Sequence, residues 1–88
     1  MLDFKPHPNY PLGATQAEIH FPNGYGASVI TGEMFYTSAE KPYELAVLDG
    51  DDLTYETPIT NDVIGYLDYD EVLEILSEIE KLPPKTIV

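Results

Sequence analysis

The chain has 88 residues, of which 16 are acidic and four are lysines, and its formal net charge is −12. A surface this acidic repels nucleic acids and anionic membranes and attracts basic proteins and cations. The absence of cysteine excludes disulfides and thiolate metal sites. We expect no signal peptide and no membrane-spanning segment, because no basic-apolar leader and no run of about 18 apolar residues is present. The composition predicts one cytoplasmic domain, residues 1–88.

Residues 1–14 are predicted to form an extended lead-in arm, because their prolines oppose a helix. From Thr15 to Phe21 apolar and polar residues alternate, which predicts a half-buried strand. Asn23-Gly24 is typical of a tight hairpin turn, so residues 25–31 should return antiparallel. Gly26 indicates a bulge or a close backbone approach beside this turn. A turn or kink at residues 32–33 would then lead into residues 34–37.

A second hairpin is predicted from residues 43–48, a turn at 49–52, and a returning strand over 53–57 that Pro58 ends. The segment 60–67 is ambiguous. Thr60 could cap a short turn that Gly65 stops.

The clearest element is a helix over residues 69–82, which Pro83-Pro84 ends. Asp68 and Glu71 have the spacing of a capping box. A helix this short is not stable alone, so its apolar side must pack on the sheet. That side carries Val72, Leu73, Ile75, Leu76, Ile79 and Leu82. We therefore predict an α+β fold: an antiparallel sheet of about four to five strands, made of two hairpins, with one C-terminal amphipathic helix on one face.

The acidic residues of this helix form a regular pattern. Asp70, Glu74 and Glu78 follow one another at four-residue steps, and Glu71 lies beside them. Like charges at this spacing cost about 0.2–0.5 kcal/mol per pair. Two interpretations stay open: a solvated face that keeps the protein soluble, with acids at the helix start favoured by the dipole, or a surface that docks onto a basic partner protein.

Tyrosine supplies most of the aromatic side chains, with seven tyrosines against three phenylalanines and no tryptophan. Amphipathic aromatic side chains are favoured at interfaces, although partial burial at strand ends is the simpler alternative. Tyr66 and Tyr69 are the best interface candidates because they lie next to the acidic helix start. The expected partner-binding residues are therefore Asp70, Glu71, Glu74, Glu78, Tyr66 and Tyr69.

No catalytic, metal or cofactor site is expected. His7 and His20 are the only histidines, and two ligands do not make a metal site. Residues 49–56 begin like a calcium loop, but Leu53 occupies the third ligand position, which leaves only weak cation binding as an alternative. Because no nucleophile motif is present either, we do not expect an enzyme.

Three segments resemble small acidic proteins encoded by tailed bacteriophages and prophages: Asn-Gly-Tyr-Gly-Ala-Ser-Val-Ile at 23–30, Tyr-Glu-Leu-Ala-Val-Leu at 43–48, and Thr-Pro-Ile-Thr-Asn-Asp-Val-Ile-Gly-Tyr-Leu at 57–67. The resemblance implies a bacterial host cytoplasm and action on a host factor, and it assigns no functional residue. Our first hypothesis is a non-enzymatic accessory protein that binds a basic host protein and could inhibit a nucleic-acid-binding or defence factor. The alternatives are a structural or assembly protein that self-associates through an open sheet edge or exposed tyrosines, and a small domain of no identifiable activity.

Overall fold

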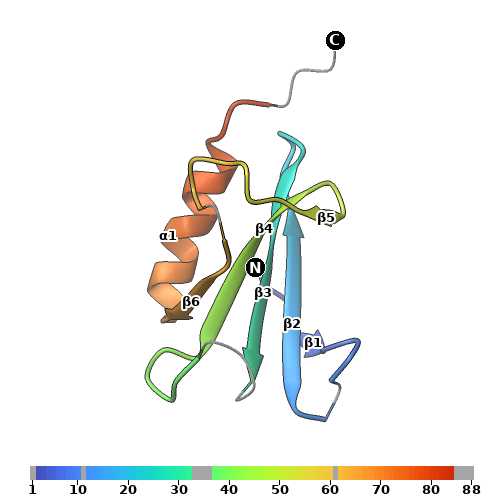
Figure 1. Ribbon diagram of the computed structural model, residues 1–88, viewed down its shortest axis with the longest axis vertical. Coiled ribbons are helices and arrows are strands. Elements are labelled where there is room, and N and C mark those ends of the chain that lie inside the picture. The colour runs from blue at the N-terminus through green and yellow to red at the C-terminus, as the bar shows by residue number, and fades with distance from the viewer. Residues whose placement is uncertain (1, 11, 33–36, 61, 85–88) are drawn as a thin grey trace.

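The computed structural model describes residues 2–10, 12–32, 37–60 and 62–84. Six strands form one antiparallel sheet in which β1 to β4 lie side by side in chain order, while β5 and β6 both pair with β4 (Figure 1). The fold is α+β with the C-terminal helix α1 packed against β3 and β4, as the sequence predicts. The elements are β1 (Lys5–Pro6), β2 (Ala14–His20), β3 (Tyr25–Gly32), β4 (Tyr43–Asp49), β5 (Asp52–Leu53), β6 (Ile64–Leu67) and α1 (Tyr69–Glu80).

The first predicted hairpin is confirmed in β2 and β3, with Ala14 opposite Gly32 and His20 opposite Gly26. Gly24 has a φ of 91°, which a turn can demand of glycine at no steric cost. A Cβ at Gly26 would collide with the carbonyl oxygen of Ile19, so this position confirms the predicted close approach of two backbones. The predicted segment 34–37 lies outside the described residues except for its last position.

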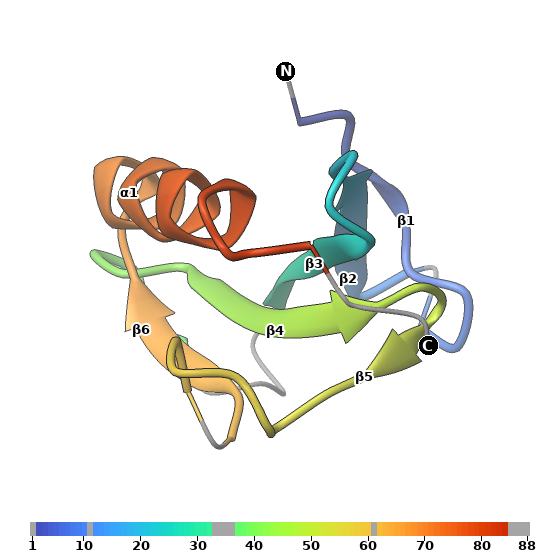
Figure 2. The same ribbon diagram turned by 90° about the horizontal axis from the view of Figure 1, so that it is seen from above.

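The sheet has one face against α1 and one face away from it. Alternate residues of β3 and β4 point to the helix, among them Val29, Leu45 and Val47, which are fully buried. Figure 2 shows α1 on one side of β3 and β4, with β5 on the other side. The period-two pattern of the sequence therefore separates a helix-bearing face from a helix-free face.

The helix begins as the sequence predicts. The Asp68 carboxylate accepts a hydrogen bond from the Glu71 backbone N–H at 2.8 Å, and the Glu71 carboxylate accepts one from the Asp68 N–H at 3.0 Å. This reciprocal pair is a capping box, and it satisfies two backbone donors that a helix start leaves without partners. On the packed side Val72, Leu76 and Ile79 are buried, while the other apolar residues of the predicted side lie at the margin of the core.

The helix ends at Glu80, two residues before the predicted end, and a side chain from the first hairpin satisfies backbone carbonyls there. The amide nitrogen of Asn23 donates to the carbonyl oxygens of Ile79 at 2.9 Å, Leu82 at 3.0 Å and Glu80 at 3.3 Å. Its amide oxygen accepts from the Tyr25 N–H at 3.0 Å. One turn residue thus closes the hairpin and also satisfies carbonyls at the helix C-terminus.

The returning strand of the second hairpin is shorter than predicted and covers only Asp52–Leu53. Beyond it the Thr54 hydroxyl accepts a hydrogen bond from the Glu56 N–H, and the Thr57 hydroxyl accepts one from the Ile59 N–H. Such side-chain turns offer the backbone an alternative to ladder pairing, so the chain leaves the sheet.

The segment 60–67, which is ambiguous in the sequence, contains the strand β6, and β6 pairs with the part of β4 that β5 does not cover. Leu67 lies opposite Tyr43 and Ile64 lies opposite Leu45, so β6 carries one residue more than β4 between these pairs. This irregularity is a bulge, and the positive φ of Tyr66 falls within it.

Of the predicted extended arm, residues 1–14, Lys5–Pro6 forms the two-residue strand β1 opposite Thr15 and Gln16. The arm then turns back into β2, with the Tyr10 N–H donating to the His7 carbonyl and the Ala14 N–H to the Tyr10 carbonyl, so it is not extended throughout. Phe4 anchors it on the helix side of the sheet, with its ring 5.7 Å from that of Tyr43. Within the described ranges, no helix is long and apolar enough to cross a membrane.

Candidate protein-binding surface

Three carboxylates lie on the side of α1 that faces away from the core. With 3.6 residues per turn, Asp70, Glu74 and Glu78 lie about 160°, 200° and 240° around the helix axis from the buried Val72. All three side chains are exposed. Successive members are about 6 Å apart along the axis, so the row is about 12 Å long. We call Asp70, Glu74 and Glu78 the acidic ridge.

No carboxylate of the acidic ridge forms an ion pair with a cation of the described residues. Among the described residues, Asp3 lies within 4.0 Å of Lys5, Glu18 of the His20 ring and Glu71 of Lys41, and none of these contacts includes a ridge carboxylate. Lys81 lines a shallow depression with Glu74 and Glu78 but forms no ion pair with them. The ridge therefore presents its negative charge to solvent.

Glu71, which the sequence groups with the ridge, is engaged within the fold. Its carboxylate lies 2.8 Å from the Lys41 ammonium and also closes the capping box with Asp68. The hydrogen bond from Lys41, followed by that from the Asp68 backbone, lowers the pKa of Glu71. In turn Glu71 raises the pKa of Lys41. Glu71 thus forms an ion pair within the fold that ties the loop before β4 to the helix start.

Tyr66 is 53% exposed, more than Tyr69, the other tyrosine predicted to lie at an interface. Its φ of 55° is in the left-handed region, which costs a non-glycine residue about 1–3 kcal/mol. The β6 bulge holds it in this conformation three residues before α1. Backbone strain of this kind persists only where the surroundings enforce it, and bulges often re-aim a side chain.

Tyr69 has a partly structural role. It is 37% exposed, and its ring lies 5.9 Å from that of Tyr43. Tyr43 also contacts the ring of Phe4, so the three rings join α1, β4 and the N-terminal arm. The simpler interpretation, a ring packed at an element's end with its hydroxyl outward, describes Tyr69 better than Tyr66.

Among the residues that the structure describes, no three His, Asp or Glu side chains are grouped so that they could hold a metal ion. Weak cation binding at residues 49–56 was the alternative to no metal site. In the structure, Asp49 and Asp52 of this segment lie opposite each other in the pairing of β4 with β5.

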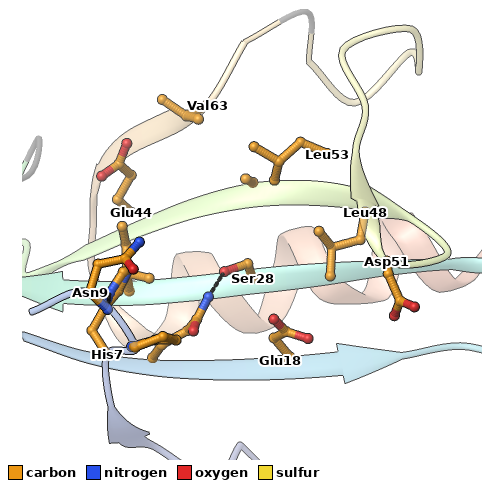
Figure 3. Close-up of a pocket in the computed structure, with 13 residues that line it drawn as sticks. His7, Asn9, Glu18, Ser28, Glu44, Leu48, Asp51, Leu53 and Val63 are labelled. Carbon is orange, nitrogen blue, oxygen red and sulfur yellow. Dashed lines mark hydrogen bonds between the residues drawn. The ribbon is translucent and has the colours of Figure 1, made fainter. Parts of the chain in front are cut away.

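A second surface feature, on the helix-free face of the sheet, was not predicted from the sequence. It is a hollow of about 380 Å³ whose floor is formed by β2, β3 and β4 (Figure 3). Two small residues, Ser28 and Ala46, lie opposite each other in the register and line this floor. The residues themselves were visible in the sequence, but the register that brings them together was not.

No family model, curated protein or solved structure matches this chain. The resemblance to phage proteins therefore stays an expectation from the sequence. The surface features of the described residues that could bind a partner are the exposed ridge, the neighbouring tyrosines and the hollow.

Proposed function

We propose that this domain is a non-enzymatic binding module that docks its acidic ridge onto a basic surface of another protein. The observation that carries the proposal is the exposure of Asp70, Glu74 and Glu78 without an ion-pair partner in the described part of the chain. A row of like charges costs helix stability, and Glu–Lys pairs at the same spacing would have been stabilising. A partner that supplies the missing cations removes this cost.

The net charge of −12 narrows the class of partner. It opposes nucleic acids and anionic membranes, and it accelerates encounter with a basic protein. A nucleic-acid-binding site is a fitting target because its Lys and Arg side chains are already arranged for phosphates. The ridge has one carboxylate per about 6 Å, whereas duplex DNA has one charge per about 1.7 Å. Contact with such a site would block it without copying the nucleic acid closely, which makes the domain an inhibitor of a bacterial host factor.

Tyr66 supplies the apolar part of the same surface. Its exposed ring next to the ridge suits an anchor in a partner's pocket, because tyrosine offers a large, rigid contact at low entropic cost. The strained backbone at this position is consistent with a side chain held outward for contact.

The test is affinity capture from a bacterial lysate with the immobilised domain. The charge-removing variant is Glu74→Gln/Glu78→Gln, and the matched control is Glu40→Gln/Glu56→Gln, which changes the charge equally at exposed sites off the helix. Gln and Glu have similar helix propensity, so the fold should persist. The wild type and the control should retain the same basic protein at about 0.05 M salt and release it at about 0.5 M. Equal retention by the ridge variant would contradict the proposal.

One observation favours self-association as a second candidate. β1 covers only Thr15 and Gln16, so the rest of β2 has no strand on its outer side among the described residues. The Phe21 N–H donates to the Tyr25 carbonyl, toward β3. Because successive residues of an antiparallel strand point their backbone groups to alternate sides, those of His20 and Glu18 point to the outer side of β2. Such an edge is a template for another strand. The strong net charge opposes association of like copies, and we rank this candidate second.

Sedimentation velocity separates the two candidates. Self-association through β2 predicts a concentration-dependent dimer that Glu18→Pro abolishes, since proline removes an outward N–H without a loss on the β3 side. A monomer at every concentration would exclude assembly through this edge.

A further inference from the structure

The helix-free face of the sheet has a regular arrangement that gives the hollow its shape. The register places Glu18, Ser28 and Ala46 side by side across β2, β3 and β4. The next row holds Gln16, Ile30 and Glu44 in the same way. Small residues thus occupy the middle of the floor, while longer side chains surround it.

Segments outside the three central strands wall the hollow on two sides. His7, Pro8 and Asn9 line it after β1, and Asp51, Leu53 and Val63 line it from the chain between β4 and β6. Figure 3 shows Leu53 and Val63 on one side of β4 and Glu18 on β2 across from them. Since α1 covers the opposite face, this site is separate from the acidic ridge.

The chemistry of the lining is rich in acceptors. Among the residues that the structure describes, it includes the carboxyl groups of Glu18, Glu44 and Asp51 and no lysine or arginine. The Gln16 amide nitrogen donates to the Ser28 hydroxyl at 2.8 Å, which leaves the amide carbonyl oxygen as a further acceptor. Ile30, Leu48 and Leu53 supply apolar surface between these groups. A complementary ligand would combine a cation that has several donors with an aliphatic stem.

We propose that the hollow receives an arginine side chain presented by a partner protein. Guanidinium has five donors in a planar fork, it matches carboxylates in pairs, and its three-carbon stem packs on apolar walls. A volume of about 380 Å³ is at the small end of ligand pockets, which suits one side chain rather than a folded segment. The inference goes beyond the ridge function because it assigns a second site on the other face of the sheet.

The experiment titrates the complete ¹⁵N-labelled chain with the blocked peptide acetyl-Gly-Arg-Gly-amide at low ionic strength. We expect saturable chemical-shift changes at the backbone amides of Glu18, Ser28 and Ala46. The matched peptide with citrulline, which has the shape of arginine without the charge, should bind at least about tenfold more weakly. Three results would overturn the proposal: equal binding of the citrulline peptide, shifts confined to α1, or tighter binding of the free amine agmatine than of the blocked peptide.

Two variants localise the effect within the protein. Glu18→Gln/Asp51→Asn removes two exposed carboxylates and should weaken arginine-peptide binding about threefold to tenfold with an unchanged melting temperature. Ala46→Leu fills the floor and should weaken it further. The control Glu74→Gln/Glu78→Gln removes the same charge from the opposite face and should leave the shifts at the amides of Glu18, Ser28 and Ala46 unaltered, so failure of the ridge proposal would not affect this result. Loss of binding in that control alone would move the site to α1 and contradict the inference.

Discussion

Replacing Asn23 by aspartate should destabilise the fold by about 1–4 kcal/mol, although the two side chains have the same shape. The amide nitrogen of Asn23 makes two short hydrogen bonds, to the carbonyls of Ile79 at 2.9 Å and Leu82 at 3.0 Å. At about 0.5–1.5 kcal/mol each, their loss accounts for about 1–3 kcal/mol. The new carboxylate also lies at the negative end of the helix dipole, which adds about 0.3–1 kcal/mol.

Aspartate keeps the other functions of this position. Asp-Gly suits the hairpin turn as well as Asn-Gly does, and the remaining oxygen can still accept from the Tyr25 N–H. The substitution therefore isolates the donor to the helix end. Asn9→Asp, on the exposed arm, makes the same change in composition and serves as the matched control.

Urea denaturation followed by circular dichroism measures the effect, with the midpoint lowered and the slope unchanged for Asn23→Asp. A parallel thermal scan should show a fall of about 4–8 °C per kcal/mol for a domain of this size. The deficit should shrink at acid pH, because protonation of the introduced carboxylate restores a donor and removes the charge. A stability within about 0.5 kcal/mol of wild type at neutral pH would refute the capping role of Asn23.

Three further predictions concern the helix start, the Lys41–Glu71 pair and the core. Asp68→Ala removes the capping box and should cost about 1 kcal/mol in the urea assay, whereas Asp68→Asn should retain most of it; equal losses would contradict the cap. Because the pKa of Glu71 is lowered in the folded state, its contribution to stability is present above the ordinary value of 4.5 and is lost as pH falls through the folded-state value. Lys41→Met should therefore make the loss of stability in acid shallower, as measured by urea midpoints from about pH 6 to 3. Because the pKa of Lys41 is raised, its contribution to folding stability is lost only above its ordinary pKa of 10.5. If stability fell with acid in Lys41→Met as it does in wild type, the result would argue against the Lys41–Glu71 pair. Ile79→Ala, at a fully buried site, should cost about 2–5 kcal/mol and Ile79→Val about 0.5–1.5 kcal/mol by the same assay; a cost below 1 kcal/mol for alanine would place Ile79 outside the core.

The elements that could be predicted from the sequence are those fixed by short-range patterns. Asn23-Gly24 predicts the first hairpin because the tight turn needs a positive φ, which Gly24 supplies. Asp68 and Glu71 define the helix start because the capping box is complete within four residues. The apolar stripe of the helix then predicts which of its sides meets the sheet.

The features that the sequence did not predict depend on contacts between distant residues. β6 has no alternating pattern of its own, and it forms because β4 still has an open edge beside Tyr43 and Leu45. Asn23 and Ile79 are 56 residues apart, and Lys41 and Glu71 are 30 residues apart. Such pairs are set by the tertiary fold, which local propensity does not encode.

The candidate surface was predicted in part. The four-residue spacing predicts that Asp70, Glu74 and Glu78 share one side of the helix, and their exposure in the structure agrees with this. The position of Lys41 beside Glu71, and the bulge at Tyr66, could not be inferred, because the first depends on a contact between distant residues and the second on the register of β6 against β4.

The ridge proposal is tested most directly by the salt dependence of affinity for the captured partner. Isothermal titration of that purified protein with wild type and with Glu74→Gln/Glu78→Gln, over about 0.05 to 0.5 M salt, gives the two slopes. We predict a steep loss of affinity for wild type and a clearly shallower slope for the variant, because two of the screened contacts are gone. Wild-type affinity that stays constant over this range, or identical slopes for the two proteins, would contradict docking through the acidic ridge.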